Sequence, residues 1–406
     1  MPVAEFIDKN TQSFYDLTKK LNIRYDIWQK GSDTVHHFPS SQKLWELCNA
    51  NGDIYKKSYE GLYCVGCEIF YAPDELNQNG ECFEHPGKKL DTVSEENYFF
   101  ALSKYQKQLT DLITTDTLAI VPETRKNEML AFLSRGLEDI SISRSNERAK
   151  NWGVPVPGDP TQRIYVWFDA LNIYQSGIGF GWDDVTYNKW WPADVQVIGK
   201  GITRFHAVYW PAFLLSAKLL LPKKLFVHEY FTVNGQKMSK SLGNVIDPSA
   251  LVDTYGTDAI RYYFLAKFSP FNDGNFSEEE FKKTYNADLA NGLGNLVARV
   301  AKLASQAGSG LNAPQGLTLV QVNTGKYKKA LEEFRFNDAL SLVWEKVKTT
   351  DKYINETKPW TLQGETLEKT LTVAVNTIVE VATLLQPFLP ETAEKILTQF
   401  MRQSIQ

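Results

Sequence analysis

The sequence predicts an α/β protein with a buried parallel sheet, followed by an all-α bundle. Short apolar runs rich in β-branched residues lie at 163–168, 194–198 and 224–231, with Gly or Pro between them. Such runs are typical of strands that are buried on both faces of a parallel sheet. From Ser277 onward only helical periodicity remains, which indicates the bundle. The 406 residues are enough for about two to four domains of roughly 100–200 residues each.

The chain begins with a predicted helix, and a region of different character follows it. The helix ends before residues 22–26, and its apolar stripe consists of Phe6, Phe14, Leu17 and Leu21. Residues 59–96 are rich in Gly, Asn and Glu, and they hold three of the four Cys. This region therefore differs from the α/β part that comes after it.

The α/β part places its candidate binding residues at the ends of strands. A helical stretch at 204–220 separates the second apolar run from the third. In parallel sheets, ligands bind beyond the carboxyl ends of the strands. This rule points to the Gly199-Lys200-Gly201 segment and to the loop after Phe231.

The last part of the chain is predicted to be helical throughout. Ser277 and Glu280 form a capping box, which starts a long helix that runs to about Gly308. Further helical stretches would complete an antiparallel bundle, at about 324–357, at about 366–385 and from Glu391 onward.

Composition excludes several classes of protein. The net charge of −4 comes from 44 basic and 48 acidic side chains, so a protein that coats nucleic acid non-specifically is not expected. An aromatic content of 13% excludes a disordered chain. No apolar stretch reaches about 18 residues, so no membrane span is predicted. Four Cys, and a start without the pattern of a signal peptide, favour the cytoplasm.

One segment departs from the slightly acidic balance of the whole chain. Residues 200–240 have a net charge of +6, because Glu229 is their only acidic side chain. Their basic side chains are Lys200, Arg204, Lys218, Lys223, Lys224, Lys237 and Lys240. A solvated helix face is one explanation, but this position at the strand ends favours phosphate-bearing ligands.

The most specific local signal is the run NGQKMSKSLGN at residues 234–244. It places two Lys and two Ser within five residues, between an Asn-Gly turn and a Gly, directly after a predicted strand. Ammonium groups in such a loop can neutralise the charge that builds up on a leaving pyrophosphate. A solvated loop without a ligand is the alternative, and the motif by itself leaves it open.

The Cys residues show the spacing of a metal site. Cys64 and Cys67 are separated by two residues, and after fourteen more residues Cys82 and His85 repeat that spacing. Two such pairs of thiolate and imidazole donors fit a closed, tetrahedral structural Zn²⁺ site. Free thiols beside a surface His are the alternative. Cys48 stands apart and is interpreted as a small buried apolar residue.

Aromatic side chains cluster on two consecutive segments of the α/β part. Trp167, Ala170, Leu171 and Tyr174 follow the first predicted strand, whereas Ile202, His206 and Trp210 follow the second. Facing aromatic groups with one His suit a pocket for a soft thioether. At helical spacing, however, aromatic residues belong more often to the core, and the pattern alone favours that alternative.

These motifs together resemble one enzyme family. KMSKS followed by LGN is the signature of class I aminoacyl-tRNA synthetases. The runs YVWFDAL, IGK, RFHAVYWPA and LFVHEYFTVNGQKMSKSLGN resemble methionyl-tRNA synthetases in particular, and the likeness covers nearly the whole chain. It implies a methionine–tRNA ligase, which activates methionine with ATP and Mg²⁺ to methionyl-adenylate and transfers it to the 3′ end of tRNA(Met).

The resemblance also implies a domain organisation, with an incomplete Rossmann-type sheet and a zinc knuckle in a connective insertion. The expected parts are a remnant of the first Rossmann half (1–45), the connective insertion with the zinc knuckle (46–162), the second Rossmann half (163–232), the KMSKS loop and stem-contact region (233–275), and the helical anticodon-binding bundle (276–406).

Site residues follow from the same resemblance. ATP would be bound by Gly199, Lys237, Met238, Ser239, Lys240 and Ser241, of which Lys237, Ser239 and Lys240 would be catalytic. Methionine would be bound by Trp167, Ala170, Leu171, Tyr174, Ile202, His206 and Trp210. Structural Zn²⁺ would be bound by Cys64, Cys67, Cys82 and His85.

Three residues of the predicted bundle match the family's anticodon readers. Asn295 and Arg299 lie one helical turn apart, and Trp360 follows a Pro. Asn and Arg can bond base edges and an exposed Trp can stack on an unpaired base. Without the resemblance, a packing role is the commoner explanation for all three.

The sequence departs from the family in three places. No His-Ile-Gly-His occurs, so we expect a chain truncated at its N-terminus, with exposed apolar strand edges and weak or no activity by itself. Gly201 stands where the family has an Asp for the ATP ribose, which would deprive Arg144 of that partner. Glu229 replaces the Gly that usually follows His228.

Two other functions remain as alternatives. A non-catalytic, tRNA-binding relative is favoured by the missing His-Ile-Gly-His and by Gly201, whereas the intact KMSKS speaks against it. A class I synthetase for another apolar amino acid, such as leucine or valine, would carry a large editing insertion, for which the segments between the strands are too short. The sequence leaves the oligomeric state open.

Overall fold

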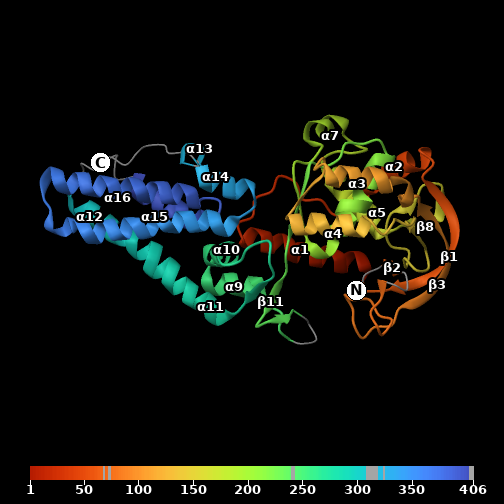
Figure 1. The fold of residues 1–406 in the computed structure, drawn as a ribbon, viewed down its shortest axis with the longest axis horizontal. Coiled ribbons are helices and arrows are strands. Elements are labelled where there is room, and N and C mark those ends of the chain that lie inside the picture. The colour runs from red at the N-terminus through yellow and green to blue at the C-terminus, as the bar shows by residue number, and fades with distance from the viewer. Residues whose placement is uncertain (67–68, 72–74, 239–242, 308–318, 323–324, 402–406) are drawn as a thin grey trace. The chain divides into compact units, whose positions relative to one another are not determined.

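The computed structural model describes residues 1–66, 69–71, 75–238, 243–307, 319–322 and 325–401 (Figure 1). The chain divides into two compact units. The central unit comprises Asp26–Val227, and the helical unit combines Met1–Tyr25 with His228–Gln406. Among the described residues, no helix has the length and apolar character needed to cross a membrane.

The sheet of the central unit confirms two of the three predicted strands. Its strands lie in the order β4 (Ala119–Val121), β10 (Lys224–His228) and β9 (Gln196–Gly199). β10 is parallel to β4, with Lys224 opposite Ala119. Leu225 and Val227 are wholly buried, as expected for a strand covered on both faces.

The prediction of a strand at 163–168 is wrong over most of that range. Only its first residues belong to a strand, and this strand pairs antiparallel in a separate sheet of order β6 (Ser143–Ser145), β8 (Asp159–Ile164) and β7 (Pro155–Val156). Helix α5 (Val166–Leu171) follows at once. Phe168 and Leu171 are both buried, and this three-residue spacing brings them to one face of a helix.

The predicted helix at 204–220 is shorter than expected and begins irregularly. A π-helical turn, η4 (Phe205–Tyr209), leads into α8 (Trp210–Ser216) after the 3₁₀ turn η3 (Lys200–Ile202). The other helices of the central unit are α2 (His37–Ala50), α3 (Gln106–Thr114), α4 (Glu123–Leu133), α6 (Ile173–Ser176) and α7 (Asp184–Trp190). One continuous core joins these helices to the sheet.

A long antiparallel ribbon carries the Cys-rich region. Strand β1 (Ile54–Cys64) pairs with β3 (Asp91–Phe100) from Ile54 opposite Phe100 to Tyr63 opposite Asp91. The short strands β2 (Ile69–Tyr71) and β5 (Ile140–Ser141) extend the ribbon on its two sides. Cys64 is the last residue of β1 and pairs with Ile69 of β2, so the ribbon places the predicted metal site at its end.

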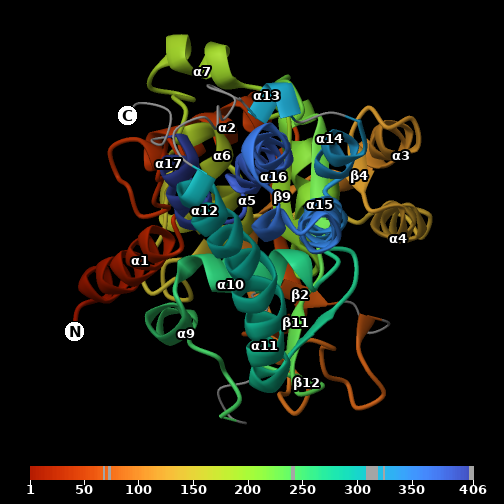
Figure 2. The same cartoon turned by 90° about the vertical axis from the view of Figure 1, so that its left-hand side faces the viewer.

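The helical unit confirms most of the predicted bundle. Its long helices lie alongside one another and are seen nearly end on in Figure 2. Their bounds are α11 (Glu278–Thr284), the π-helical η6 (Tyr285–Gly294), α12 (Asn295–Ala307), α13 (Leu319–Val322), α14 (Gly325–Glu332), α15 (Phe336–Thr357), α16 (Gly364–Leu385) and α17 (Pro390–Met401). As predicted, the Ser277 side chain caps α11 by accepting a hydrogen bond from the Glu280 amide.

One predicted helix of the bundle is in fact two. The stretch 324–357 breaks between α14 and α15, where Phe334 has a φ of 58°. A non-glycine residue in the left-handed region interrupts the helical backbone hydrogen bonds, so a new helix starts at Phe336. Apolar residues recur at helical spacing on both sides of this break, so the sequence pattern does not show where one helix ends and the next begins.

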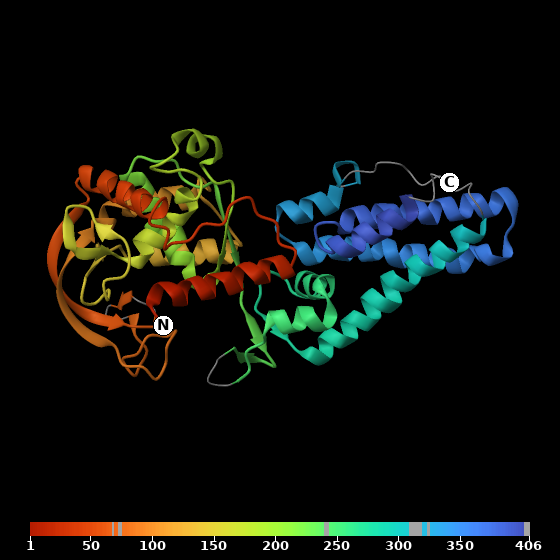
Figure 3. The same ribbon diagram turned by 180° about the vertical axis from the view of Figure 1, so that it is seen from behind.

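A small layer precedes the bundle and includes the first helix of the chain. It consists of α1 (Val3–Lys20), α9 (Pro248–Tyr255), α10 (Thr257–Ala266) and a three-stranded sheet of order β12 (Gln236–Lys237), β11 (Phe231–Val233) and β13 (Gly274–Phe276). The first helix, red in Figure 3, contacts α9. The predicted run at 224–231 is therefore divided between β10 and β11.

Apolar side chains are exposed in both units. The helix α1 is confirmed, but Phe14 is 65% exposed and no residue of this helix is buried. In β9, Val197 is 60% exposed although its neighbours Gln196 and Ile198 are buried.

Candidate functional site

Two aromatic rings stack on each other where the sequence predicts the amino-acid site. The Trp167 ring on α5 stacks on the Phe205 ring of η4, with 3.8 Å between ring centroids and 11° between planes. Phe205 is buried and Trp167 is partly exposed. Trp167 lies on the short helix α5, directly after a strand, and Phe205 lies on the π-helical turn η4. Turns of this π-helical kind occur frequently at functional sites.

His206 and Tyr174 form the polar part of the same site. The His206 Nδ1 lies 2.9 Å from the carbonyl oxygen of Ile202, which can only accept, so Nδ1 carries a proton. The Tyr174 hydroxyl lies 2.8 Å from His206 Nε2 and donates to it. Both nitrogens of a neutral imidazole are thereby satisfied, which fixes a single tautomer.

Burial keeps both of these side chains uncharged at neutral pH. Desolvation lowers the pKa of His206 to about 4, although its hydrogen bond to the Ile202 carbonyl opposes this shift. Desolvation also raises the pKa of Tyr174 to about 12. The pair therefore offers a polarisable, neutral surface between aromatic rings, which suits an uncharged side chain with a soft atom.

The other residues predicted for this site divide into two groups. Ala170 and Ile202 are partly exposed, so a ligand can reach them. Leu171 and Trp210 are almost completely buried and belong to the core of the central unit. The Trp210 ring packs edge to face on Trp191, with centroids 6.3 Å apart.

Gly201 and Glu229 differ from the residues of the family, and Arg144 is the side chain that was expected to lose its acidic partner. Gly201 is exposed in η3, two residues beyond the end of β9 at Gly199. Arg144 is buried, and its Nη1 donates to Ser143 O at 2.7 Å and to Ser141 Oγ at 3.0 Å. Glu229 is 7% exposed, and its amide donates to the Pro270 carbonyl. Arg144 therefore bonds Ser141 and Ser143, whereas Gly201 provides no carboxylate for it.

A tight hairpin precedes the KMSKS motif, as the Asn-Gly pair predicts. Thr232 pairs with Lys237, and both Asn234 and Gly235 have positive φ, of 50° and 76°. Two such residues are typical of a type I′ turn. Lys237 and Met238 are exposed at its end, whereas the predicted ATP-binding residues Ser239, Lys240 and Ser241 lie outside the described residues.

Three of the four predicted metal ligands lie together. The ligand atoms of Cys64, Cys82 and His85 are within 4.8 Å of one another. Cys64 Sγ is 3.2 Å from Cys82 Sγ, and His85 Nδ1 is 3.7 Å from Cys82 Sγ. A Cβ at Gly66 would lie 2.7 Å from the His85 ring, so the glycine permits this approach. Cys67 lies outside the described residues.

The donors of this cluster fit a zinc ion. Both thiols are almost completely buried, and a neutral imidazole completes a set of ligand types that Zn²⁺ prefers. Cys48 lies elsewhere, buried in α2, with its Sγ 3.5 Å from the Phe213 carbonyl. Its interpretation as a buried apolar residue agrees with this position.

The three predicted base-reading residues lie on the helical unit. Arg299 on α12 donates through Nη1 to Asp351 Oδ1 at 2.6 Å and through Nη2 to Asn355 Oδ1 at 2.7 Å. Asn295 is exposed at the start of α12, and Trp360 is 55% exposed in the 3₁₀ turn η7 (Pro359–Thr361). An exposed Trp on a helical surface is free to stack on a base.

Comparison with known proteins assigns the family. Residues 1–301 match the family model of tRNA synthetases class I (M), and residues 319–405 match the anticodon-binding domain of tRNA ligases. The chain belongs to the class I tRNA synthetases (M).

Individual members of this family resemble the chain along its length. It is 41% identical to the methionine–tRNA ligase of Thermotoga maritima, over 97% of this chain and 64% of the relative. It is 40% identical to that of Nostoc sp., over 97% of this chain and 77% of the relative. The chain thus spans under two thirds of the Thermotoga relative's length.

Solved structures of the family have the same fold. The methionyl-tRNA synthetase of Mycobacterium tuberculosis in complex with methionyl-adenylate superposes with a TM-score of 0.89 at 35% identity. The superposition covers all of this chain and 84% of the other. The fold of this class I synthetase chain is thus a mixed α/β catalytic domain with a parallel sheet, together with a helical anticodon-binding domain.

Sequence reasoning missed several partners of the predicted residues. It did not find Phe205 beneath Trp167, nor Asp351 and Asn355 beside Arg299. Asp351 and Asn355 are four residues apart, a spacing that puts both on one face of a helix and was available as a signal. No local pattern connects that face with Arg299, which lies 52 residues before Asp351.

Proposed function

We propose that the chain acts as a methionine–tRNA ligase. Methionine and Mg-ATP would form methionyl-adenylate and pyrophosphate, and the methionyl group would then pass to the terminal adenosine of tRNA(Met). Family membership supports the reaction class, and the Thermotoga and Nostoc relatives carry the name of this activity. On the same basis we propose that the protein works in the cytoplasm, where tRNA is charged.

The observation that carries the proposal is the neutral Tyr174–His206 pair beside the stacked Trp167 and Phe205 rings. A thioether gains dispersion and sulfur–aromatic contacts from such rings. A charged His would instead demand a counter-ion or water in the pocket. The low pKa of His206, about 4, therefore matches an apolar amino-acid side chain.

Activation of methionine requires positioning and charge stabilisation more than proton transfer. The methionine carboxylate is already an anion at neutral pH, so it can attack the α-phosphate of ATP without a general base. Negative charge then builds on the leaving pyrophosphate. Lys237 and Lys240, with Ser239 and Ser241, would bind these phosphates, while Gly199 and Met238 would line the ATP site.

The cluster of Cys64, Cys82 and His85 would hold a structural Zn²⁺, with Cys67 as the fourth ligand. Two closely spaced thiols repel each other as thiolates, and a divalent cation relieves this repulsion. The metal would contribute folding energy at the end of the ribbon and take no part in the reaction.

Recognition of tRNA would involve the helical unit. Asn295 and Trp360 are exposed, and Arg299 is oriented by Asp351 and Asn355. We propose that these three residues read the anticodon, and that the domain limits follow the order predicted above, with the anticodon-binding bundle at 276–406. A cation held by one carboxylate and one amide keeps a fixed direction, as base recognition requires.

Pyrophosphate exchange into ATP tests the proposed activity. We expect exchange that depends on methionine, with leucine supporting it about 100-fold less well because the pocket distinguishes the two side chains by a few kcal/mol. Replacement of Lys237 by Gln should lower the rate about 10-fold or more, since one phosphate-neutralising charge is lost. Exchange that proceeds equally well with leucine would contradict the proposal.

One observation favours a second candidate function. Gly201 offers no carboxylate where the family has an Asp for the ATP ribose, as a non-catalytic tRNA-binding relative would. Binding of tRNA(Met) in a filter assay, without any methionine-dependent exchange, would support this second function instead of the ligase.

A further inference from the structure

A buried polar cluster lies behind the candidate methionine site, in the central unit. It joins α2 to α5 and α6, and none of its members belongs to the predicted site. The members are His37, Ser40 and Ser41 on α2, Asp169 on α5, Asn172 between the helices, and Ser176 on α6. All except Asp169 are buried completely.

His37 is the centre of this cluster because its two ring nitrogens contact two different helices. Nδ1 lies 2.7 Å from Ser176 Oγ on α6. Nε2 lies 2.9 Å from Asp169 Oδ1 on α5, a close contact that lacks the geometry of a hydrogen bond. The imidazole therefore bridges α5 and α6 from the side of α2.

Two hydroxyl groups of α2 strengthen the same connection. Ser41 Oγ donates to Asp169 Oδ1 at 2.7 Å. Asn172, at the junction of the two short helices, donates through Nδ2 to Ser40 Oγ at 2.9 Å. Buried polar groups that contact one another in this way favour one arrangement of the elements that carry them.

A Ser, a His and an Asp in contact invite comparison with a hydrolytic triad. In this chain His37 and Ser176 have no exposed surface, so no substrate can reach the hydroxyl. A nucleophile must contact the group that it attacks. The cluster can therefore act only on the elements that surround it.

Those elements carry the methionine-site side chains. Asp169 is two residues after Trp167, and Ser176 is two residues after Tyr174. The helix α5 has six residues and α6 has four, which is too short for either to hold its place without tertiary contacts. The contacts of His37 are tertiary contacts of this kind.

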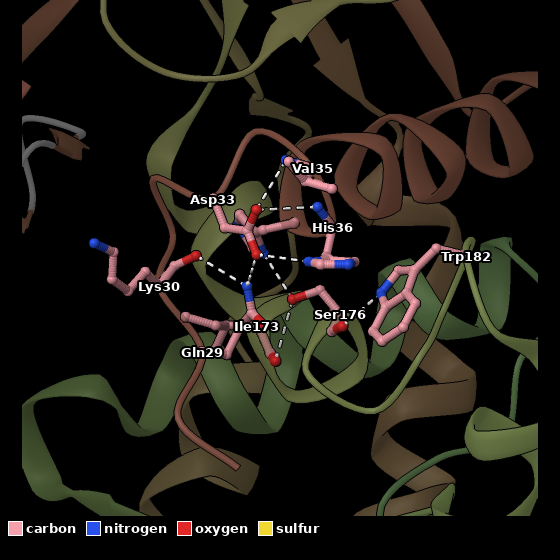
Figure 4. Close-up of polar contacts among 9 residues, drawn as sticks. Gln29, Lys30, Asp33, Val35, His36, Ile173, Ser176 and Trp182 are labelled. Atoms are coloured by element: carbon pink, nitrogen blue, oxygen red, sulfur yellow. Dashed lines mark hydrogen bonds and ion pairs between the residues drawn. The ribbon is translucent and has the colours of Figure 1, made fainter.

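Asp33 holds the turn that leads into α2 (Figure 4). Asp33 Oδ1 accepts from the amides of Val35 and His36 at 2.8 and 3.1 Å. The His36 ring packs on the Trp182 ring with 4.4 Å between centroids, and Trp182 Nε1 donates to the Ser176 carbonyl at 2.8 Å. His37 thus contacts the Ser176 hydroxyl, and Trp182, on which His36 packs, bonds the Ser176 carbonyl.

We infer that His37 is a positioning residue of the methionine site. It holds α5 and α6 so that Trp167 and Tyr174 stay in place for the ligand. The inference rests on the proposed function, because it concerns methionine as the ligand of this site. It assigns no chemical step to His37.

Methionine binding to the whole chain, measured by isothermal titration calorimetry, tests this inference. The substitution His37→Ala should weaken methionine binding about 10-fold or more, which corresponds to about 1.4 kcal/mol. His37→Asn keeps a hydrogen-bonding group near Ser176 and should recover part of the affinity. It also provides a second variant if the alanine variant does not fold.

Leu44→Ala is the matched control. Leu44 is completely buried on the same helix α2, but it is a core residue without a polar contact to α5 or α6. It should lower the melting temperature at least as much as His37→Ala and leave the methionine Kd within about twofold, since a general loss of stability does not move a binding site.

The outcomes separate the inference from the proposed function. If the unsubstituted chain binds methionine and His37→Ala binds it equally well, the inference is wrong and the proposed function stands. If Leu44→Ala weakens binding as much as His37→Ala, the effect is general and the positioning role is again wrong. If the unsubstituted chain does not bind methionine, both fail.

Discussion

His206 shows how one buried side chain joins stability to binding. Its Nδ1–H donates to the Ile202 carbonyl and its Nε2 accepts from Tyr174, so the neutral ring satisfies both partners. Protonation would turn Nε2 into a donor, so the Tyr174 hydroxyl would have to turn its own proton away and accept instead. Because the residue is 2% exposed, solvent cannot compensate for the charge.

This environment predicts a pH dependence of stability. Burial lowers the pKa of His206 to about 4, whereas the pKa of an unfolded His is about 6.5. Between these values the unfolded chain binds the proton and the folded chain does not. The free energy of unfolding should therefore rise with pH across this window, by up to roughly 3 kcal/mol from this residue.

Thermal unfolding at pH 4.5, 5.5 and 6.5 measures the effect. The substitution His206→Gln should reduce the pH dependence, because it removes the group whose protonation differs between the two states. His36→Gln is the control, since the side chain of His36 is 43% exposed. An unchanged pH slope in the His206 variant would contradict the low pKa.

The segments of the ribbon region differ in how much their own pairing and packing stabilise them. The β1–β3 ribbon pairs continuously from Ile54 to Tyr63, and Phe99 and Phe100 are buried at its base. Residues 75–90 form turns and bends, and Cys82 is the only buried side chain among these described residues. A cross-link by a metal is one way to order such a segment.

We therefore expect one zinc ion per chain and a local effect of its removal. Replacement of Cys82 by Ser should abolish stoichiometric zinc and increase hydrogen exchange in residues 75–90, while the sheet around β10 remains protected. Metal analysis and exchange mass spectrometry report these two effects. Cys48→Ala is the control and should retain the zinc, because Cys48 lies outside the cluster.

At the scale of the whole molecule, the first helix belongs with the last two fifths of the chain. Lys20 Nζ lies 2.7 Å from Asp253 Oδ1 and from Ser249 Oγ, and Thr257 donates to the Lys20 carbonyl. Arg261 donates to the carbonyls of Leu21, Pro387 and Phe388 at 3.1, 2.6 and 2.9 Å. One guanidinium thus connects three segments of the helical unit.

Two units with separate cores predict two unfolding transitions in calorimetry. Methionine should raise the unfolding temperature of the central unit only, because it binds the folded form of that unit. Arg261→Ala should lower the unfolding temperature of the helical unit, because the loss of hydrogen bonds from a charged donor destabilises the folded unit by about 2 kcal/mol or more.

Arg335→Ala is the control for this prediction. Arg335 bonds Glu333 and Asp338 at the surface, where ion pairs contribute at most about 1 kcal/mol. A single transition that methionine and Arg261→Ala shift together would contradict two independent units.

Local patterns in the sequence were sufficient to predict the features that depend on neighbouring residues. Ser277 and Glu280 specified a cap, Asn234-Gly235 specified a hairpin turn, and the spacing of Cys82 and His85 placed two ligands side by side. Each of these requires contacts over a few residues only, so local conformational preference is sufficient.

Tertiary structure alone decided what lies next to what across long separations. Residues 166–168 form a helix although their composition favours a strand, because Phe168 packs against Trp45 and Phe213 in the core. His37 meets Ser176 across 139 residues, and Arg299 meets Asp351 across 52. Such partners are selected by the packing of whole elements, whose energy no local pattern contains.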